Sequence, residues 1–337
     1  MKHIKPIKLG SLTLPSNVFY APLAGCSDYP FRMMSAQYHP GLMFCEMVKM
    51  DALIRSDQNS FRLLDYHKSM RPIGAQLCGS KLEYAAACAR IIEDLGFDTL
   101  DLNCGCPVDK VTKDGSGSAM LKTPWLIGDI IAEMANAISI PVTVKIRCGW
   151  DDNTINAPQI TKIAELAGAQ AITIHGRTRV QGYKGLADRN HIKDCKDVAT
   201  TIKVIGNGDV FSGPSGIDFF EETGCDGILV ARGTMGQPWI AEDIRRFDQG
   251  LPPLEFSGQE YKNLLMQHLH HIISYGNDKK ALLDLRRVGC WYLKKGKGTK
   301  ALREGINKAK SLDSALDVIE SYDWTSAYFS IEQTVHA

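Results

Sequence analysis

The fold is decided by the stretch Leu102-Asn103-Cys104-Gly105-Cys106-Pro107. It continues the run Thr99-Leu100-Asp101-Leu102, which has the character of a buried strand. The strand ends at a turn that carries an amide, two thiols and a proline. A (β/α)₈ barrel builds its active site at the carboxyl ends of its strands. This stretch therefore predicts such a barrel, with reactive side chains at its mouth.

Eight apolar runs recur along the chain, and a helical pattern follows each of them. Their near-continuous apolar character is typical of parallel strands that are buried on both faces. We expect helices to begin near Pro124, Pro158 and Pro214, and the pair Ser80 and Glu83 predicts a capping box. The predicted strands span residues 17–21, 42–46, 73–77, 99–103, 142–146, 171–175, 203–207 and 227–231.

Three glycines punctuate the chain in the same way, because Gly96, Gly168 and Gly224 each precede a polar or glycine-rich strand end by seven residues. We expect each of them to end a helix in the left-handed conformation. Eight strand-then-helix units form either a closed barrel or a doubly wound sheet. The barrel is favoured because polar residues stand at most strand ends, whereas a doubly wound sheet concentrates them near one switch point.

The pattern changes after Phe247, where Gly250-Leu251-Pro252-Pro253 has the composition of a linker. Beyond it no strand-like run returns. We therefore expect a TIM barrel over residues 1–250 and a small all-helical domain over 255–337. Apolar residues recur there at helical spacing, at Tyr261, Leu265, Leu269 and Ile272.

Bulk composition indicates a soluble cytoplasmic protein. The chain has no apolar run long enough to span a membrane and no apolar segment near Met1 that resembles a signal peptide. Its ten cysteines are dispersed, which is typical of reduced thiols. The formal net charge of +1 says nothing about partners. We expect a monomer.

The ends of the predicted strands differ chemically from their interiors, since a packed barrel would not bury charge without partners. One ligand surrounded by the mouth explains the pattern. Glycine-rich loops after the seventh and eighth strands stand where barrels commonly bind phosphate, and Arg232 adds charge there. The strand-end residues are Pro22, Glu46, Gln76, Asn103 with Cys106, Lys145, His175, Asn207-Gly208-Asp209 and Ala231-Arg232-Gly233.

Lys145 and His175 each allow two interpretations. A cation at the mouth could stabilise a flavin that gains negative charge on reduction, or it could be a structural lysine paired with a carboxylate. The histidine could hydrogen-bond a flavin edge or a phosphate, or it could be structural.

Cys104 and Cys106 do not predict a metal site, because no second pair stands at zinc-ligand spacing. A nucleophilic cysteine needs a base that lowers the thiol pKa. A neutral thiol, with an ordinary pKa of about 8.5, can instead act as a general acid toward a carbanion-like centre. The alternative for any single cysteine is a small buried hydrophobe.

Taken together, these residues resemble the tRNA-dihydrouridine synthases, with the bacterial B-type subgroup most similar, from about residue 5 to about residue 310. The Asn-x-Gly-Cys-Pro motif is highly specific, whereas the glycine loops are not. The resemblance is carried by Ala21-Pro22-Leu23-Ala24-Gly25, Asp28-Tyr29-Pro30-Phe31-Arg32, Leu102–Pro107, Val144-Lys145-Ile146-Arg147, His175-Gly176-Arg177-Thr178, Asn207-Gly208-Asp209 and Ala231-Arg232-Gly233.

The resemblance implies an FMN barrel followed by a helical tRNA-binding domain, with NADPH or NADH as electron donor. It makes Cys106 the proton donor and puts Cys104 in a variable slot. Asn103 would contact the target uracil, and we assign Arg177 to the substrate side as well. The implied FMN contacts are Pro22, Leu23, Ala24, Gln76, Lys145, His175, Asn207, Gly208, Asp209, Ala231 and Arg232. Leu23 stands where methionine is common in the family, and Ala231 where glycine is common.

A basic run from Leu285 to Lys310 supports an RNA partner, because it holds nine cations, a single acid, Glu304, and the aromatic residues Trp291 and Tyr292. We expect Arg286, Arg287, Lys294 and Lys295 to contact tRNA phosphates. The alternative is a solvated helix face, with Trp291 packed in the core. Two other functions stay open: another FMN barrel that reduces a small molecule, and a tRNA-binding or scaffold protein without catalysis.

Overall fold

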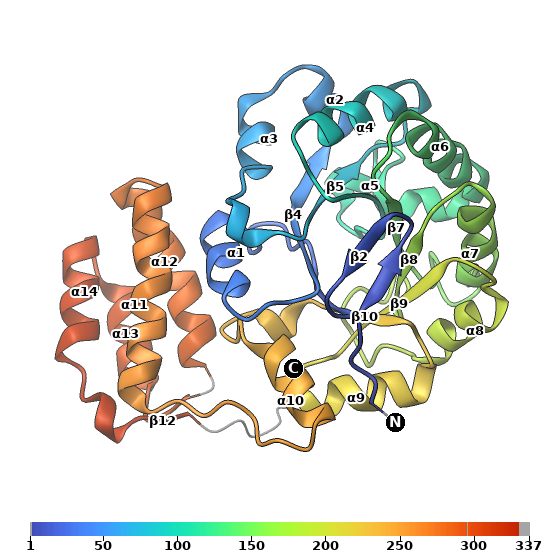
Figure 1. Ribbon diagram of the computed structural model, residues 1–337. Coiled ribbons are helices and arrows are strands. Elements are labelled where there is room, and N and C mark those ends of the chain that lie inside the picture. The colour runs from blue at the N-terminus through green and yellow to red at the C-terminus, as the bar shows by residue number, and fades with distance from the viewer. Residues whose placement is uncertain (1, 295, 330–337) are drawn as a thin grey trace.

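A closed barrel of eight parallel strands forms the centre of the computed structural model, which describes residues 2–294 and 296–329 (Figure 1). The strands follow the order β10-β3-β4-β5-β6-β7-β8-β9 around the barrel, so each pairs with its neighbour in sequence and the last closes on the first. All eight predicted strands are present, and the predicted TIM barrel is confirmed. They are β3 (Val18–Tyr20), β4 (Leu42–Lys49), β5 (Ile73–Cys78), β6 (Thr99–Cys104), β7 (Val142–Arg147), β8 (Ala171–His175), β9 (Lys203–Asn207) and β10 (Gly227–Val230).

Helices connect the strands and cover the outside of the barrel (Figure 1). They are α1 (Tyr29–Ala36), α2 (Met50–Ile54), α3 (Gln58–Leu63), α4 (Ala85–Asp94), α5 (Asp109–Thr112), α6 (Pro124–Ala137), α7 (Ala157–Leu166), α8 (Asn190–Val198), α9 (Gly213–Thr223) and α10 (Ile240–Asp248). Short 3₁₀ turns lie at η1 (Lys68–Met70), η2 (Leu82–Tyr84), η3 (Gly117–Lys122) and η4 (Arg232–Thr234).

Local signals at the helix ends are confirmed with one exception. Pro124, Pro158 and Pro214 stand in the first turns of α6, α7 and α9. The three punctuating glycines have φ angles of +82°, +95° and +62°, in the left-handed region. The capping box at Ser80 is wrong: η2 has no side-chain cap, and the Ser80 hydroxyl donates to the carbonyl of Asp114 at 3.1 Å instead.

Side chains alternate along each strand between the barrel interior and the surrounding helices. At the amino end of the strands the interior is apolar, and the N-terminal hairpin of β1 (Ile7–Leu9) and β2 (Leu12–Leu14) lies across it (Figure 1). This hairpin was not predicted. Its apolar side chains pack with interior residues of the barrel, among them Phe19, Phe44, Ile205 and Leu229. The hairpin therefore covers the amino end of the barrel.

A second unit, which we call the helical domain (residues 258–329), lies beside α1 (Figure 1). It has its own apolar core, to which the barrel contributes Trp239. The domain corrects the all-helical expectation in one detail, since β11 and β12 form a two-stranded antiparallel sheet. Its elements are α11 (Gly258–Tyr275), α12 (Asp278–Leu293), β11 (Gly296–Lys297), α13 (Lys300–Lys308), α14 (Leu312–Ser321), η5 (Trp324–Ser326) and β12 (Tyr328–Phe329).

Candidate active site

Five polar side chains that the sequence predicted at strand ends lie at the carboxyl end of the barrel. Because all strands are parallel, their carboxyl ends meet at the same rim. The pairing register sets Gln76 beside Asp101, Asn103 beside Lys145, and His175 beside Asn207. We call this polar end of the barrel the mouth.

A chain of hydrogen-bonded side chains leads from inside the barrel to the cysteine turn. Asp101 Oδ2 accepts from Gln76 Nε2 at 2.7 Å, and Gln76 Oε1 accepts from Asn103 Nδ2 at 2.8 Å. Asn103 Oδ1 then accepts from the backbone N–H of Cys106 at 2.9 Å. A carboxylate only accepts, so it fixes the orientation of both amides. Asn103 therefore keeps one amide N–H to offer a ligand, as a donor.

Asp101 is the member of this chain that the sequence analysis missed. It is buried, and burial raises the pKa of its carboxyl to about 6, although hydrogen bonds from Thr143 and Gln76 and the charge of Lys145 oppose that shift. It stands two residues before Asn103, so the two share the inner face of β6. That alternation is the signal that could have found it.

The structure separates the two cysteines of the turn. Cys104 is fully buried on the helix-facing side of β6, its thiol lies 3.7 Å from the sulfur of Met120, and burial raises its pKa well above the ordinary value. Cys106 is only partly buried. Its carbonyl accepts from both the N–H and the hydroxyl of Ser118, at 3.0 and 2.9 Å. Of the two, Cys106 is the thiol that the backbone holds near the mouth.

Lys145 is half-buried between β6 and β8. Burial lowers the pKa of its ammonium to about 8, the charge of Arg147 lowers it further, and Asp101 and Cys106 act in the opposite direction. Within residues 2–294 and 296–329 the ammonium makes neither a hydrogen bond nor an ion pair. The nearest acidic influence is Asp101, whose charge raises the pKa of the ammonium without a direct bond to it, so the structural alternative stays open.

His175 is buried and has one satisfied ring nitrogen. Its Nδ1 lies 2.9 Å from Asn207 Oδ1, and the Asn207 amide nitrogen donates to the carbonyl of Leu229 at 2.6 Å, which fixes the amide orientation. Burial and the neighbouring cations hold the pKa of His175 well below its ordinary value, so the ring is neutral. Nδ1 then carries the proton, and the buried Nε2 is an acceptor without a partner in the described chain.

The loop after β9 has the geometry of an anion site. Gly208 has a φ of +144°, and a Cβ added there would meet the Cβ of Ala187 at 2.5 Å, so the position requires glycine. Asp209 follows with a φ of +51°. In the part of the chain that the structure covers, the N–H groups of Gly208 and Asp209 donate no hydrogen bond. Free N–H groups of this kind suit phosphate oxygens.

The carboxylate of Asp209 is itself occupied by two arginines. Arg177 Nη2 lies 2.7 Å from Asp209 Oδ2, and Arg232 Nη2 lies 2.8 Å from Asp209 Oδ1. Arg177 is buried and also donates to the carbonyl of Gly185 at 2.6 Å. Arg177 therefore braces the loop after β8, and only the backbone of Asp209 is left for an anion.

The first predicted contact segment, Pro22 to Ala24, lies in the loop between β3 and α1. Leu23 is held in a compact turn, since its N–H donates to the Ser27 hydroxyl at 2.8 Å and its carbonyl accepts from the N–H groups of Cys26 and Ser27. Pro22 and Leu23 are partly exposed, and so are Ala231 and Arg232 after β10, which pairs with β3. The two segments are therefore adjacent at the rim.

The cations of the helical domain do not form one free cluster. Arg286 Nη2 donates to the carbonyl of Ala309 at 2.5 Å. Arg287 donates to the carbonyl of Gly25 and lies 3.1 Å from Asp284. Lys294 is exposed, and Lys295 lies outside the described residues. Both arginines thus have structural roles, and phosphate contact by any of the four stays a prediction.

Two other site classes find no support among the described residues. No group of three or more His, Cys, Asp or Glu side chains is arranged to hold a metal ion there. No helix in that part of the chain is long and apolar enough to cross a membrane. All ten cysteines are free thiols.

The residues at the mouth have the chemistry to hold an anionic cofactor such as a flavin. An unpartnered ammonium at Lys145 and an unpartnered acceptor at His175 Nε2 lie on adjacent strands. The free N–H groups of Gly208 and Asp209 follow in the loop after the next strand, β9. Buried polar atoms in native proteins normally have partners, so the buried and unpartnered Nε2 of His175 suits a hydrogen-bond donor on a bound molecule.

Comparison with known proteins identifies the family. Residues 19–327 match the family model for dihydrouridine synthases. A probable tRNA-dihydrouridine synthase 1 of Synechocystis sp. is 36% identical over 94% of this chain and 89% of its own, and tRNA-dihydrouridine synthase B of Vibrio cholerae is 34% identical over 94% and 98%.

Solved structures add a likeness of fold alone. Histamine dehydrogenase from Rhizobium sp. superimposes with a TM-score of 0.57 at 12% identity, over 80% of this chain and 51% of its own. A 2-naphthoyl-CoA reductase gives a TM-score of 0.56 at 11% identity, over 74% and 52%. The chain therefore spans about half the length of these two proteins. The family model and the relatives together show that the chain belongs to the dihydrouridine synthase family and is an oxidoreductase.

Proposed function

We propose that the protein reduces the C5–C6 double bond of uridines in tRNA to 5,6-dihydrouridine, with FMN as cofactor and NADPH or NADH as electron donor. One observation carries the proposal: in a chain of this family, Asn103 and the partly exposed Cys106 stand on one turn, beside the unpartnered Lys145. We propose tRNA as the substrate because the names of the relatives above specify tRNA.

Each residue at the mouth has a proposed task in that reaction. FMN, when bound, would supply a hydride for C6 of the uracil. Asn103 donates its free amide N–H to a carbonyl oxygen of the base and so orients the ring. Cys106 gives its thiol proton to C5 as a general acid. Because a base inside the barrel mouth cannot stay stacked in RNA, the target uridine must be flipped out.

The proposed cofactor would be held at three places. Lys145 supplies a positive charge, and His175 Nε2 accepts a hydrogen bond. The free N–H groups of Gly208 and Asp209 would bind the phosphate, with Arg232 close by. The remaining proposed contacts are Pro22, Leu23, Ala24, Gln76, Asn207 and Ala231.

Residues 255–337 are proposed to bind tRNA, and residues 1–250 to carry the chemistry. A substrate made in the cytoplasm and ten free thiols support a cytoplasmic location. We propose that the protein acts as a monomer.

Two measurements test the proposal against its rivals. Purified protein should be yellow, and apo-protein should bind FMN in a titration; a colourless protein that takes up no flavin would contradict the cofactor. Dihydrouridine mapped in tRNA from cells that lack the protein should be lost at specific positions. Complete retention at every position would favour a reductase of small molecules or a binding protein without catalysis.

A further inference from the structure

The loop between β3 and α1, residues 21–28, is hydrogen-bonded at Gly25 both to the barrel and to the helical domain. From the barrel, Glu46 on β4 accepts the Gly25 N–H. From the helical domain, Arg287 on α12 donates to the Gly25 carbonyl, and its Nη2 lies 3.2 Å from Asp28 Oδ2. Gly25 has a φ of +71°, so its carbonyl orientation belongs to a conformation that other residues rarely adopt.

Arg287 is itself held in place by its own domain. Asp284, one helical turn earlier, lies 3.1 Å from Arg287 Nη2, and the guanidinium stands over the ring of Trp291 at 5.3 Å from its centroid. A guanidinium donates several hydrogen bonds in a fixed fork, so one side chain can join three acceptors. The Arg287 side chain is therefore held in one position by the helical domain.

We propose that Arg287 is a positioning residue through which the helical domain holds the flavin-contacting segment Pro22–Ala24 in its binding conformation. The inference rests on the proposed cofactor. It deepens that proposal, because it makes flavin affinity depend on a contact that comes from the helical domain. The compact turn at Leu23 connects this contact to the segment. Cys26 and Ser27 are hydrogen-bonded to Leu23, and they are the sequence neighbours of Gly25 and Asp28.

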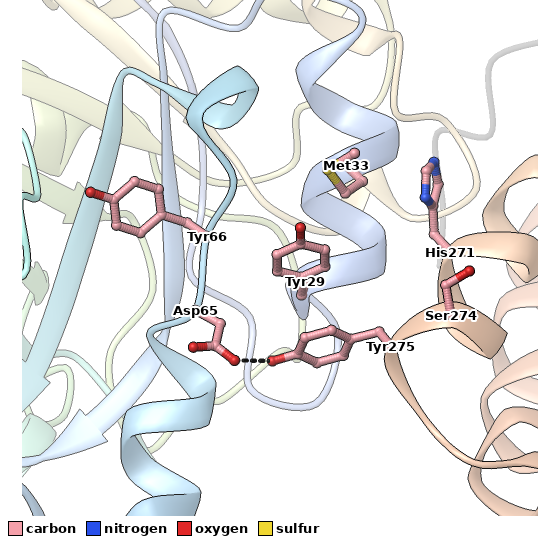
Figure 2. A pocket seen from close by; sticks show the side chains of 7 residues that line it. All are labelled: Tyr29, Met33, Asp65, Tyr66, His271, Ser274 and Tyr275. Carbon is pink, nitrogen blue, oxygen red and sulfur yellow. Dashed lines mark hydrogen bonds between the residues drawn. The ribbon is translucent and has the colours of Figure 1, made fainter.

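A second contact between the same two units offers a matched control. The rings of Tyr29 on α1 and Tyr275 on α11 stack at 4.5 Å, and the Tyr275 hydroxyl donates to Asp65 at 2.7 Å (Figure 2). These residues, with Met33, line a cavity of about 370 Å³. Tyr275→Phe removes this hydroxyl, which also donates to the carbonyl of Arg62 at 3.0 Å, and it changes no contact of residues 21–28.

The experiment measures FMN affinity of the full-length apo-protein by the quenching of flavin fluorescence. Arg287→Ala should weaken FMN binding about tenfold, because a charge-assisted hydrogen bond to the loop is lost. Arg287→Lys should recover part of the affinity, since an ammonium keeps the charge but not the fork. Tyr275→Phe should bind FMN as the wild type does. Thermal unfolding of each apo-protein shows whether the variants fold.

The outcomes separate the two proposals. Wild-type affinity in Arg287→Ala would overturn the positioning role and leave the proposed cofactor intact. An equal loss of affinity in Tyr275→Phe would also overturn it, because loosening of the domain contact in general would then be the cause. If the wild-type protein binds no FMN at all, the proposed cofactor fails, and the inference fails with it.

Discussion

The barrel mouth and helix α12 both gather charged side chains, but the fold treats them differently. In the mouth, the ammonium of Lys145 has no partner among the described residues. On α12, Arg286 and Arg287 are bonded to carbonyls of Ala309 and Gly25. Strand ends of a closed barrel converge on one point. Successive positions on a helix point about 100° apart, so neighbouring cations in sequence face different surroundings.

The difference teaches how to weigh the two kinds of pattern. A polar residue at a barrel strand end has few directions to face, and the mouth is one of them. A cation in a basic helix has a long side chain that can reach its own chain as easily as an RNA. The following variants test whether the free charges and the thiol of the mouth take part in the chemistry, and whether the cations of α12 stabilise the structure.

The largest effect should come from Cys106. Cys106→Ala should lower the rate of dihydrouridine formation by about 10³-fold, because the general acid is lost. Cys104→Ala should be mild, since that thiol is buried against Met120. Single-turnover assays with tRNA measure both, and FMN binding and flavin reduction by NADPH should stay near normal. Equal losses in the two variants would contradict the assignment.

Lys145→Met should lower activity by about 100-fold, because the mouth loses its unpartnered cation. The pKa of Lys145 is lowered to about 8, below that of an ordinary lysine. Between pH 8 and 10 the unfolded chain therefore binds more protons than the native one, so wild-type stability should rise with pH relative to the variant. Unfolding free energies of the two flavin-free proteins at both ends of this range measure it, and a constant difference would count against an unpaired ammonium.

Asp101→Asn should lower activity about tenfold, through loss of the orientation of Gln76 and Asn103. An asparagine can donate as well as accept, so the amides are no longer forced into one arrangement. The expected signature is a higher KM for tRNA together with a lower kcat. A variant with wild-type kcat and KM would show that the amides orient themselves.

The smallest effect should come from replacing Lys294 and Lys295 with alanine. tRNA affinity should fall by less than about tenfold near 0.1 M salt, and the salt slope by about 2, as fewer counterions are released. Filter-binding titrations at several salt concentrations measure both quantities. Arg286→Ala is the comparison. It should lower the unfolding temperature and change the salt slope of tRNA binding little. An unchanged slope in the lysine variant would remove the RNA surface from this end of α12.

Sequence alone predicted the strands and the mouth because buried parallel strands are apolar throughout and their ends are not. It did not predict the β1–β2 hairpin, whose strands have three residues each and offer too short a pattern. The capping box predicted at Ser80 does not form, because the Ser80 hydroxyl donates to the carbonyl of Asp114, which is distant in sequence. The partner of Arg287 could not be foreseen either, since the bond to Gly25 joins residues 262 positions apart.

The N-terminal hairpin has a consequence for the order of events in catalysis. Its apolar side chains, with those of Phe19 and Phe44, fill the amino end of the barrel, so a molecule that reaches the polar half arrives from the mouth. On the proposed reaction, the nicotinamide donor and the flipped uridine would then enter through the same opening. They would have to bind one after the other. Plots of reciprocal initial rate against the reciprocal concentration of one substrate, at several fixed concentrations of the other, would then give parallel lines.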